Sequence, residues 1–323
     1  MSTPPQGKLA LPKLAEMKRR GERIVMVTAY DAPGARFAED AGIDVVLVGD
    51  TAAMVVLGYD GTVPVTMDEM VFLARTVARA ARRPIVIGDM PFGSYQVSDE
   101  AAVENAIRFF KEAGADAVKL EGAGPSLSRV RAIVGAGIPV MGHVGLTPQS
   151  ATMLGGFKTQ GKTAGAALRL VDDAVALEEA GCFSVVLEAV PAPVAAEVTR
   201  RLSVPTIGIG AGPDCDGQVL VYHDLLGLTE GHLPRFVKRY ANLSREIRDA
   251  LESYAEDVRS GTFPEEQHAY EMPSDELEEF ERMTERPSAS NPSAQATKSS
   301  SSPMNAQLPA PRSEPPLRKT SSP

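Results

Sequence analysis

The sequence of 323 residues contains no tryptophan, two cysteines and four histidines. Cys182 and Cys215 cannot build a disulfide framework, and their spacing does not match a zinc finger. No apolar run approaches the roughly 20 residues that a membrane-spanning helix needs. A nucleic-acid binder is also disfavoured, because 42 acids against 33 bases give a net charge of −9. These absences predict a soluble, cytoplasmic protein that binds neither membranes nor nucleic acids.

Composition changes sharply near Met272. Residues 287–323 are dominated by serine and proline and lack periodic apolar residues, so they cannot bury enough surface to offset the entropy of ordering. We therefore predict a folded domain over residues 1–272 and a disordered tail over 273–323. The acidic run Asp275–Glu281 is expected to be a solvated segment, with a short helix as the alternative.

Residues 20–260 alternate short apolar runs rich in β-formers with longer amphipathic segments. The predicted strands are Ile24–Ala29, Val45–Gly49, Ile85–Gly88, Ala117–Leu120, Val140–Gly142, Ser184–Leu187, Thr206–Ile209 and Arg235–Tyr240. The predicted helices are Ala35–Ala41, Met67–Ala80, Asp99–Ala113, Ser126–Val134, Thr163–Ala180, Val194–Leu202, Gln218–Leu226 and Ser244–Ser260.

Eight such units favour a (β/α)₈ TIM barrel of the α/β class. The alternative is an open doubly wound sheet, which would carry a glycine-rich fingerprint after its first strand. The segment Tyr30-Asp-Ala-Pro-Gly does not supply one. Residues 8–20 are expected to form a short helix that caps the bottom of the barrel.

Functional residues of a barrel gather at the C-terminal ends of its strands. The predicted strand ends carry Asp31, Asp50, Asp89, Lys119, Glu121, His143 and Glu188. Several converging carboxylates repel one another, and a divalent cation relieves that repulsion. Ligation by oxygen alone favours Mg²⁺ over zinc. The alternative is that each aspartate caps the next helix or closes a turn.

Lys119 and Glu121 are two residues apart on a strand, so their side chains point the same way. The lysine could neutralise a substrate carboxylate, form a Schiff base or make a structural ion pair with Glu121. A neighbouring metal site favours the electrostatic role.

Glu188 follows the apolar run Val185–Leu187, and apolar surroundings make a carboxylate a stronger base. It is a candidate general base, or else the structural partner of a nearby arginine or lysine. His143 either donates a hydrogen bond to a substrate oxygen or satisfies the loops beside it.

Long motifs surround these residues: Thr28-Ala-Tyr-Asp, Val48-Gly-Asp-Thr, Gly58-Tyr-Asp-Gly-Thr-Val-Pro-Val-Thr, Gly88-Asp-Met-Pro-Phe-Gly-Ser-Tyr, Val118-Lys-Leu-Glu-Gly, Gly142-His-Val-Gly-Leu-Thr-Pro-Gln and Ile207-Gly-Ile-Gly-Ala-Gly. In these motifs the chain resembles the ketopantoate hydroxymethyltransferase family. The resemblance runs from about Leu14 to Tyr270 and does not include the tail.

The resemblance implies a Mg²⁺-dependent enzyme of pantothenate and coenzyme A synthesis. It would transfer the one-carbon unit of 5,10-methylenetetrahydrofolate to 3-methyl-2-oxobutanoate through an enolate, giving 2-dehydropantoate and tetrahydrofolate. Large homo-oligomers are typical of the family, which implies a decamer.

Site residues follow from the same resemblance. It implies metal ligands at Asp50, Asp89 and Glu121, and oxo-acid contacts at Asp50, Thr51, Asp89 and Lys119. The proton acceptor is Glu188. One departure is that Thr51 stands where the family usually has serine, followed by two alanines rather than Leu-Gly; threonine keeps the hydroxyl.

Two other functions are alternatives. A Mg²⁺-dependent oxo-acid lyase or mutase of the phosphoenolpyruvate mutase type would show a catalytic cysteine loop, and neither cysteine lies in one. A catalytically silent barrel, acting as a scaffold or sensor, would be expected to lose one of the key polar residues. Asp50, Asp89, Lys119 and Glu188 are all present.

Overall fold

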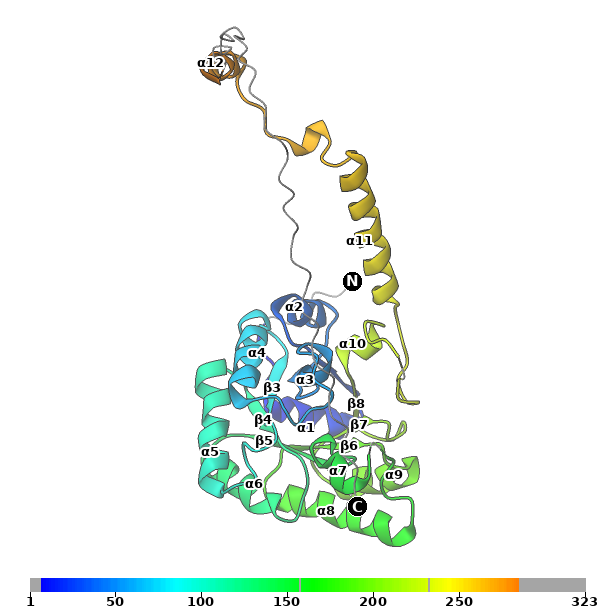
Figure 1. Cartoon of the computed structure of the whole chain (residues 1–323). Helices are drawn as coiled ribbons and strands as arrows, with labels where there is room; N and C mark the ends of the chain where they lie inside the picture. The colour runs from blue at the N-terminus through cyan, green and yellow to red at the C-terminus, as the bar shows by residue number, and fades with distance from the viewer. Residues whose placement is uncertain (1–6, 157, 232, 285–323) are drawn as a thin grey trace, which may run out of the picture. The chain divides into compact units, whose positions relative to one another are not determined.

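The computed structural model describes residues 7–156, 158–231 and 233–284. The chain divides into two compact units with a boundary between Arg259 and Ser260. The first unit contains all the strands named below (Figure 1). It also contains the residues of the candidate site.

The first unit is built on eight parallel strands that close into a barrel in chain order. They are β1 Ile24–Thr28, β2 Val45–Val48, β3 Ile85–Asp89, β4 Ala117–Lys119, β5 Val140–Gly145, β6 Ser184–Glu188, β7 Thr206–Ile209 and β8 Gly217–Leu220. The barrel closes where Ile24 pairs with Gly217 and Val27 with Leu220. Strands such as β2 and β3 are buried along their whole length, as expected of parallel strands covered on both faces. The predicted (β/α)₈ barrel is confirmed.

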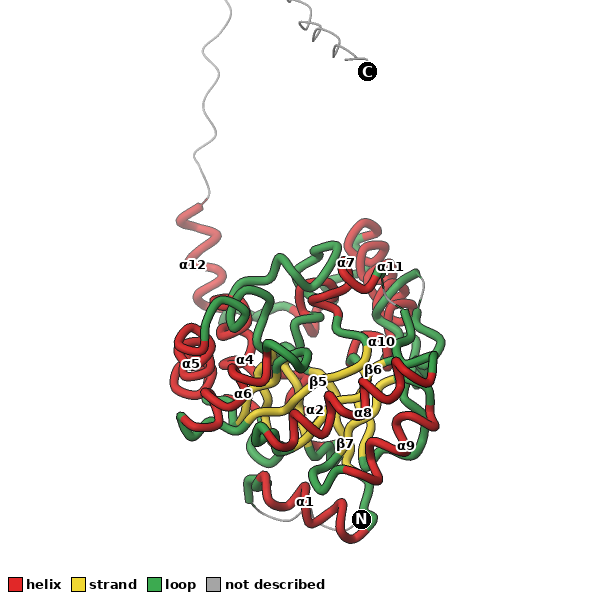
Figure 2. Tube along the Cα trace, turned by 90° about the horizontal axis from the view of Figure 1, so that it is seen from below, coloured by secondary structure: helices red, strands yellow, loops and turns green. Residues whose placement is uncertain are grey.

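Helices surround the strands, as the red and yellow tubes of Figure 2 show. They are α2 Ala32–Asp40, α3 Ala52–Val55, α4 Met67–Ala80, α5 Asp99–Arg108, the π-helical turn η1 Phe109–Ala113, α6 Ser126–Gly135, the 3₁₀ turn η2 Pro148–Ser150, α7 Ala151–Leu154, α8 Ala164–Glu179, α9 Ala192–Arg201 and α10 Tyr222–Leu225. A further helix, α11 Leu243–Ser260, follows them in the chain, and none of its residues is buried. Side-chain caps fix where several of them begin. Thr66 and Glu69 form a reciprocal capping box at α4, and Ser98 and Thr163 cap α5 and α8.

The predicted N-terminal helix is α1, Leu11–Arg20, and it closes the bottom of the barrel (Figure 2). Its buried residues Leu14 and Met17 belong to one apolar cluster with inward-facing strand residues such as Ile24 and Ile85. Lys18 fastens the helix from the side, because its ammonium lies 2.8 Å from a carboxylate oxygen of Asp216. The bottom of the barrel is therefore packed, and the polar strand ends lie at the other end.

The prediction of the eighth strand was wrong. Residues 235–240 contain only turn and irregular backbone, while β8 lies at Gly217–Leu220 and overlaps the start of the segment predicted as a helix from Gln218 to Leu226. The cause is tertiary, since β8 is defined by its pairing with both β7 and β1. Gly217 allows this close approach, because a Cβ there would lie 2.5 Å from the carbonyl oxygen of Ile24.

The second unit contains the 3₁₀ turn η3 Glu266–His268 and α12 Ser274–Thr284. This corrects the expectation of disorder for residues 274–284, whose acidic run forms a helix. Asp275 and Glu276 lie in its first turn, where carboxylates interact favourably with the helix dipole. Arg282 forms an ion pair with Glu279 at 3.1 Å. The rest of the predicted tail, residues 285–323, lies outside the described residues.

Among the described residues, no helix is both long enough and apolar enough to cross a lipid bilayer. The cytoplasmic location stays a prediction.

Candidate active site

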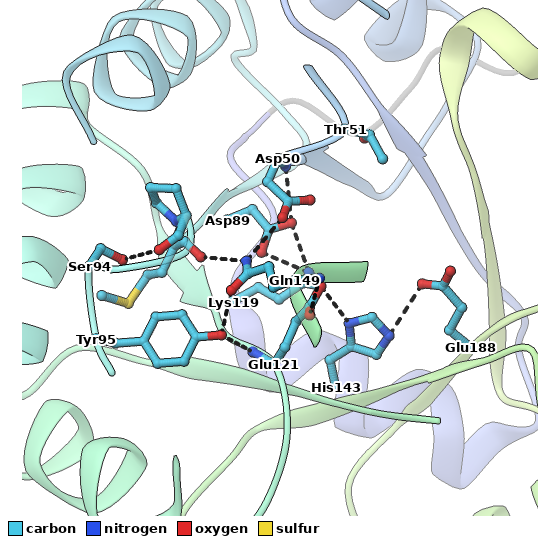
Figure 3. Close-up of polar contacts among 12 residues, drawn as sticks. Asp50, Thr51, Asp89, Ser94, Tyr95, Lys119, Glu121, His143, Gln149 and Glu188 are labelled. Carbon is cyan, nitrogen blue, oxygen red and sulfur yellow. Dashed lines mark hydrogen bonds and ion pairs between the residues drawn. The ribbon is translucent and has the colours of Figure 1, made fainter. Parts of the chain in front are cut away.

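The polar residues predicted at the strand ends meet around one cavity of about 450 Å³. Asp89, Lys119 and Glu188 each end a strand (β3, β4 and β6), His143 lies on β5, and Asp50 follows β2 by two residues. Glu121, two residues after β4, completes the group. Asp50, Asp89, Lys119, Glu121 and His143 are all buried. Figure 3 shows these side chains converging from their separate strands.

Lys119 and Asp89 form the tightest contact of the group. The ammonium donates to both carboxylate oxygens of Asp89 at 2.7 Å, and the backbone N–H of Asp50 donates to Asp89 Oδ2 at 3.2 Å. Burial raises the pKa of Asp89 to about 7, although the ammonium opposes that shift. Burial lowers the pKa of Lys119, but the neighbouring carboxylates of Asp89, Glu121 and Asp50 outweigh it and the net shift is upward. A protonated, paired lysine favours the electrostatic role over a Schiff base, which requires the free amine.

His143 lies between two carboxylates (Figure 3). Its Nε2 is 3.3 Å from Glu188 Oε2, and its Nδ1 is 3.7 Å from Glu121 Oε1. Burial lowers the pKa of His143, and Glu188 opposes that shift. A neutral imidazole carries one N–H, so it can donate to only one of the two carboxylates at a time. The structure thus places His143 against Glu188 and Glu121 rather than against neighbouring loops.

Gln149 of η2 also belongs to the site, although it was not among the predicted site residues. Its side-chain N–H groups donate to Asp50 Oδ2 at 3.0 Å and to the Met90 carbonyl at 2.9 Å, and its backbone N–H donates to Glu121 Oε2 at 3.1 Å. The hydroxyl of Tyr95 donates to its amide oxygen at 2.7 Å. Tyr95 and Gln149 are the last residues of the motifs that begin at Gly88 and Gly142, and this position in a family motif was the sequence signal that could have indicated them.

Thr51 and Asp31 have different places. Thr51 lines the cavity, and its hydroxyl lies 2.8 Å from the Tyr30 hydroxyl. Asp31 is exposed and caps α2, because its carboxylate accepts the N–H of Gly34 at 2.7 Å. Helix capping, the alternative function for a strand-end aspartate, therefore applies to Asp31, while Asp50 and Asp89 face the cavity.

The oxygen atoms of the site fit a hard divalent cation. Within the described ranges, no three Asp, Glu, His or Cys side chains come close enough together to hold a metal ion by themselves. Mg²⁺ commonly uses one or two protein carboxylates and completes its shell with water and substrate oxygens. Asp50 and Asp89 are adjacent, and buried Glu121 Oε1 has no hydrogen-bond partner among the described residues. Burial also raises the pKa of Glu121 well above its usual range, so this oxygen needs a proton or a cation.

Comparison with known proteins identifies the family. A family model described as ketopantoate hydroxymethyltransferase matches residues 8–266. The chain belongs to this family. A relative from Moorella thermoacetica, named 3-methyl-2-oxobutanoate hydroxymethyltransferase, is 58% identical over 265 residues, covering 82% of this chain and 98% of that protein. A relative from Arabidopsis thaliana, named 3-methyl-2-oxobutanoate hydroxymethyltransferase 1, mitochondrial, is 52% identical over 283 residues. The match covers 85% of this chain and 82% of that protein.

Solved structures of low sequence identity share the barrel fold. A phosphonopyruvate hydrolase matches with a TM-score of 0.53 at 16% identity, covering 84% of this chain and 96% of that chain. A phosphoenolpyruvate phosphomutase from Streptomyces platensis matches with a TM-score of 0.54 at 19% identity, covering 86% and 100%. At these identities the likeness concerns the fold alone. The lyase or mutase alternative thus shares the fold, while the relatives from Moorella thermoacetica and Arabidopsis thaliana share more than half of the aligned residues with this chain.

Proposed function

We propose that the protein transfers the one-carbon unit of 5,10-methylenetetrahydrofolate to 3-methyl-2-oxobutanoate, with water supplying the hydroxyl oxygen. The products are 2-dehydropantoate and tetrahydrofolate. The observation that carries this proposal is the arrangement at the strand ends. Lys119 and Asp89 form a buried pair, and Glu188 faces the same cavity with its side chain 16% exposed. The family membership supports the same reaction.

Binding of the oxo acid requires positive charge in the cavity, because the substrate is an anion and the cavity is lined by carboxylates. An anion enters a cavity already lined by Asp50, Asp89, Glu121 and Glu188, with Lys119 as the buried ammonium beside them. Lys119 offsets part of the negative charge, and the hydroxyl of Thr51 offers a neutral hydrogen-bonding group. Mg²⁺ bound at Asp50 and Asp89, with Glu121 beside them in the cavity, would supply a Lewis acid for the 2-oxo and carboxylate oxygens.

Glu188 is the proposed proton acceptor. The hydrogen on C3 of the oxo acid is acidified by the adjacent carbonyl, and its removal leaves an electron pair that forms the new bond to the methylene carbon. The two bonds from that carbon to folate nitrogens break, water supplies the hydroxyl, and the nitrogens take up the protons released from C3 and from water as tetrahydrofolate leaves. Glu188 reaches the cavity from the end of β6 and is more exposed than the Asp89–Lys119 pair, so it can meet a substrate bound over that pair. His143 Nε2 lies 3.3 Å from Glu188 Oε2, so the imidazole is placed to orient this carboxylate.

The test separates proton removal from folate chemistry. With Mg²⁺ in D₂O and no folate, the wild-type protein should exchange the C3 hydrogen of 3-methyl-2-oxobutanoate for deuterium, as followed by NMR. Glu188→Gln keeps the shape of the side chain but removes the base, so exchange should slow by about 10²–10⁴-fold. Glu179→Gln, an exposed position on α8, is the matched control. Wild-type exchange rates in a stable Glu188→Gln protein would exclude Glu188 as the base.

A homo-oligomer is also proposed, and the decamer stays a prediction. The helix α11 supports it, because none of its residues is buried and Ile247, Leu251 and Val258 repeat on one face at helical spacing. Exposed apolar faces of this kind commonly pack against another chain. Light scattering should report a large assembly for the wild-type chain and a smaller one for Leu251→Lys. A wild-type monomer would contradict the proposal.

A further inference from the structure

The cavity has an outer part that the proposed proton transfer does not use. Besides the buried strand-end residues, it is lined by Lys158 and Thr159 from the segment between α7 and α8, and by residues 234–236 from the segment after α10. Lys158 and Arg235 are exposed, whereas the strand-end residues are buried. One continuous cavity therefore leads from the surface to the Asp89–Lys119 pair.

The cavity is larger than the oxo acid requires. Its volume of about 450 Å³ lies in the range of roughly 300–1,000 Å³ that is typical of pockets for drug-sized ligands. A branched five-carbon acid is much smaller than such a ligand and fills only the inner end. The outer end is left for a second, longer molecule.

Charge differs between the two ends. The inner end carries the carboxylates of Asp50, Asp89 and Glu121. At the outer end, Lys158 and Arg235 form no ion pair with any carboxylate of the described residues. Asp224 also lines the cavity, and its carboxylate accepts a hydrogen bond from the Thr229 hydroxyl at 2.6 Å. Exposed cations without an ion-pair partner favour an anionic ligand group, and arginine binds carboxylates through paired N–H donors.

An aromatic side chain stands at the same outer end. Phe236 packs its ring on the backbone of Gly210, where a Cβ would lie 2.5 Å from Phe236 Cδ1. The glycine after β7 is therefore what allows the ring to reach the cavity wall. A flat apolar ring that lines the same cavity as two cations suits a ligand that is aromatic in its middle and anionic at its end.

We infer that Lys158, Arg235 and Phe236 form the folate subsite. This rests on the proposed function, because folate carries its reactive methylene carbon at the pteridine end and its glutamate carboxylates at the far end. The methylene must reach the oxo acid at the inner end, so the carboxylates point outward to Lys158 and Arg235. An aromatic ring of the folate then lies against Phe236.

The experiment removes the two cations together. In Lys158→Ala/Arg235→Ala, the KM for 5,10-methylenetetrahydrofolate should rise at least tenfold, and calorimetry with tetrahydrofolate should show the same loss of affinity. Phe236→Leu should weaken tetrahydrofolate binding as well. The matched control is Lys162→Ala/Lys238→Ala, which removes two exposed lysines that do not line the cavity. The control should leave the KM and the tetrahydrofolate affinity unchanged.

Deuterium exchange of the oxo acid without folate separates this inference from the proposed function. The double variant should exchange the C3 hydrogen at the wild-type rate, because its strand-end residues are intact. An unchanged tetrahydrofolate affinity and KM in the folded double variant would overturn the subsite. A wild-type protein that fails to exchange the C3 hydrogen would instead overturn the proposed reaction.

Discussion

Substituting methionine for Lys119 keeps most of the side-chain volume and removes the ammonium that lies 2.7 Å from both carboxylate oxygens of Asp89. The two side chains are only 5% and 2% exposed, so the carboxylate left behind has little access to water. Breaking a buried ion pair on one side typically costs about 3–5 kcal/mol of folding free energy. We expect a loss of that size at pH 8.5 in the presence of EDTA.

The loss should depend on pH, and its sign follows from the pKa of Asp89. Burial raises this pKa from 3.8 to about 7, and removing the ammonium raises it further. A carboxylate with a raised pKa in the folded state stabilises the fold below its unfolded pKa and loses that contribution as pH rises through its folded pKa. In the wild-type protein, the fall in unfolding free energy that comes from Asp89 ends near pH 7. In the variant the pKa of Asp89 is higher, so this fall continues above pH 7 at about 1.4 kcal/mol per pH unit. The destabilisation at pH 8.5 should therefore exceed that at pH 6 by about 2 kcal/mol.

Urea unfolding of both proteins at pH 6 and pH 8.5 measures this difference. The control is Lys18→Met, which breaks the Lys18–Asp216 pair at the bottom of the barrel, where the side chains are 15% and 14% exposed. The control should cost less than Lys119→Met and equally at both pH values. An equal cost of Lys119→Met at pH 6 and pH 8.5 would refute the argument that Asp89 is a buried carboxylate held by this lysine.

Two further predictions concern the metal and the backbone. Mg²⁺ binds deprotonated carboxylates, and burial raises the pKa of both Glu121 and Asp89. The increase in melting temperature on adding Mg²⁺ should therefore be larger at pH 8 than at pH 6. A larger increase at pH 6 would contradict the metal site. Gly145→Ala should destabilise the protein by more than ~2 kcal/mol in urea unfolding, because φ is 101° and the new Cβ would lie 2.2 Å from the Glu188 carbonyl oxygen. Gly21→Ala, with φ 67° and no heavy atom within 4 Å of its Cβ, should cost about 1 kcal/mol, and an equal loss at both glycines would count against the clash.

Local patterns were sufficient to predict most of the barrel. The seven strands from β1 to β7 match predicted apolar runs to within a few residues, because a buried parallel strand needs a continuous run of β-formers. β8 has four residues, including a glycine and the exposed Gln218, so its sequence carries little strand signal. Its pairing with β1 and β7 creates the strand, and that contact is invisible to a local pattern.

The same distinction holds in the site. Asp89, Lys119 and Glu188 end their strands, so the topology of a closed barrel places them together once the strands are known. Gln149 and Tyr95 come from the loops after β5 and β3, whose paths depend on tertiary packing. The hydrogen bond from Gln149 to Asp50, and the one from the Glu121 backbone N–H to the Tyr95 hydroxyl, could therefore not be predicted from the sequence.

The helix α1 has a kinetic consequence. Leu14 and Met17 fill the bottom of the barrel, and the strands above them are packed with apolar side chains, so ligands reach the buried pair through the polar end. Under the proposed function, two substrates of very different size then share one passage, with the smaller bound beneath the larger. The oxo acid must arrive before the folate, and tetrahydrofolate must depart before the new 2-oxo acid can escape. Steady-state kinetics should therefore show sequential, ordered addition, with tetrahydrofolate competing against methylenetetrahydrofolate only at the outer position.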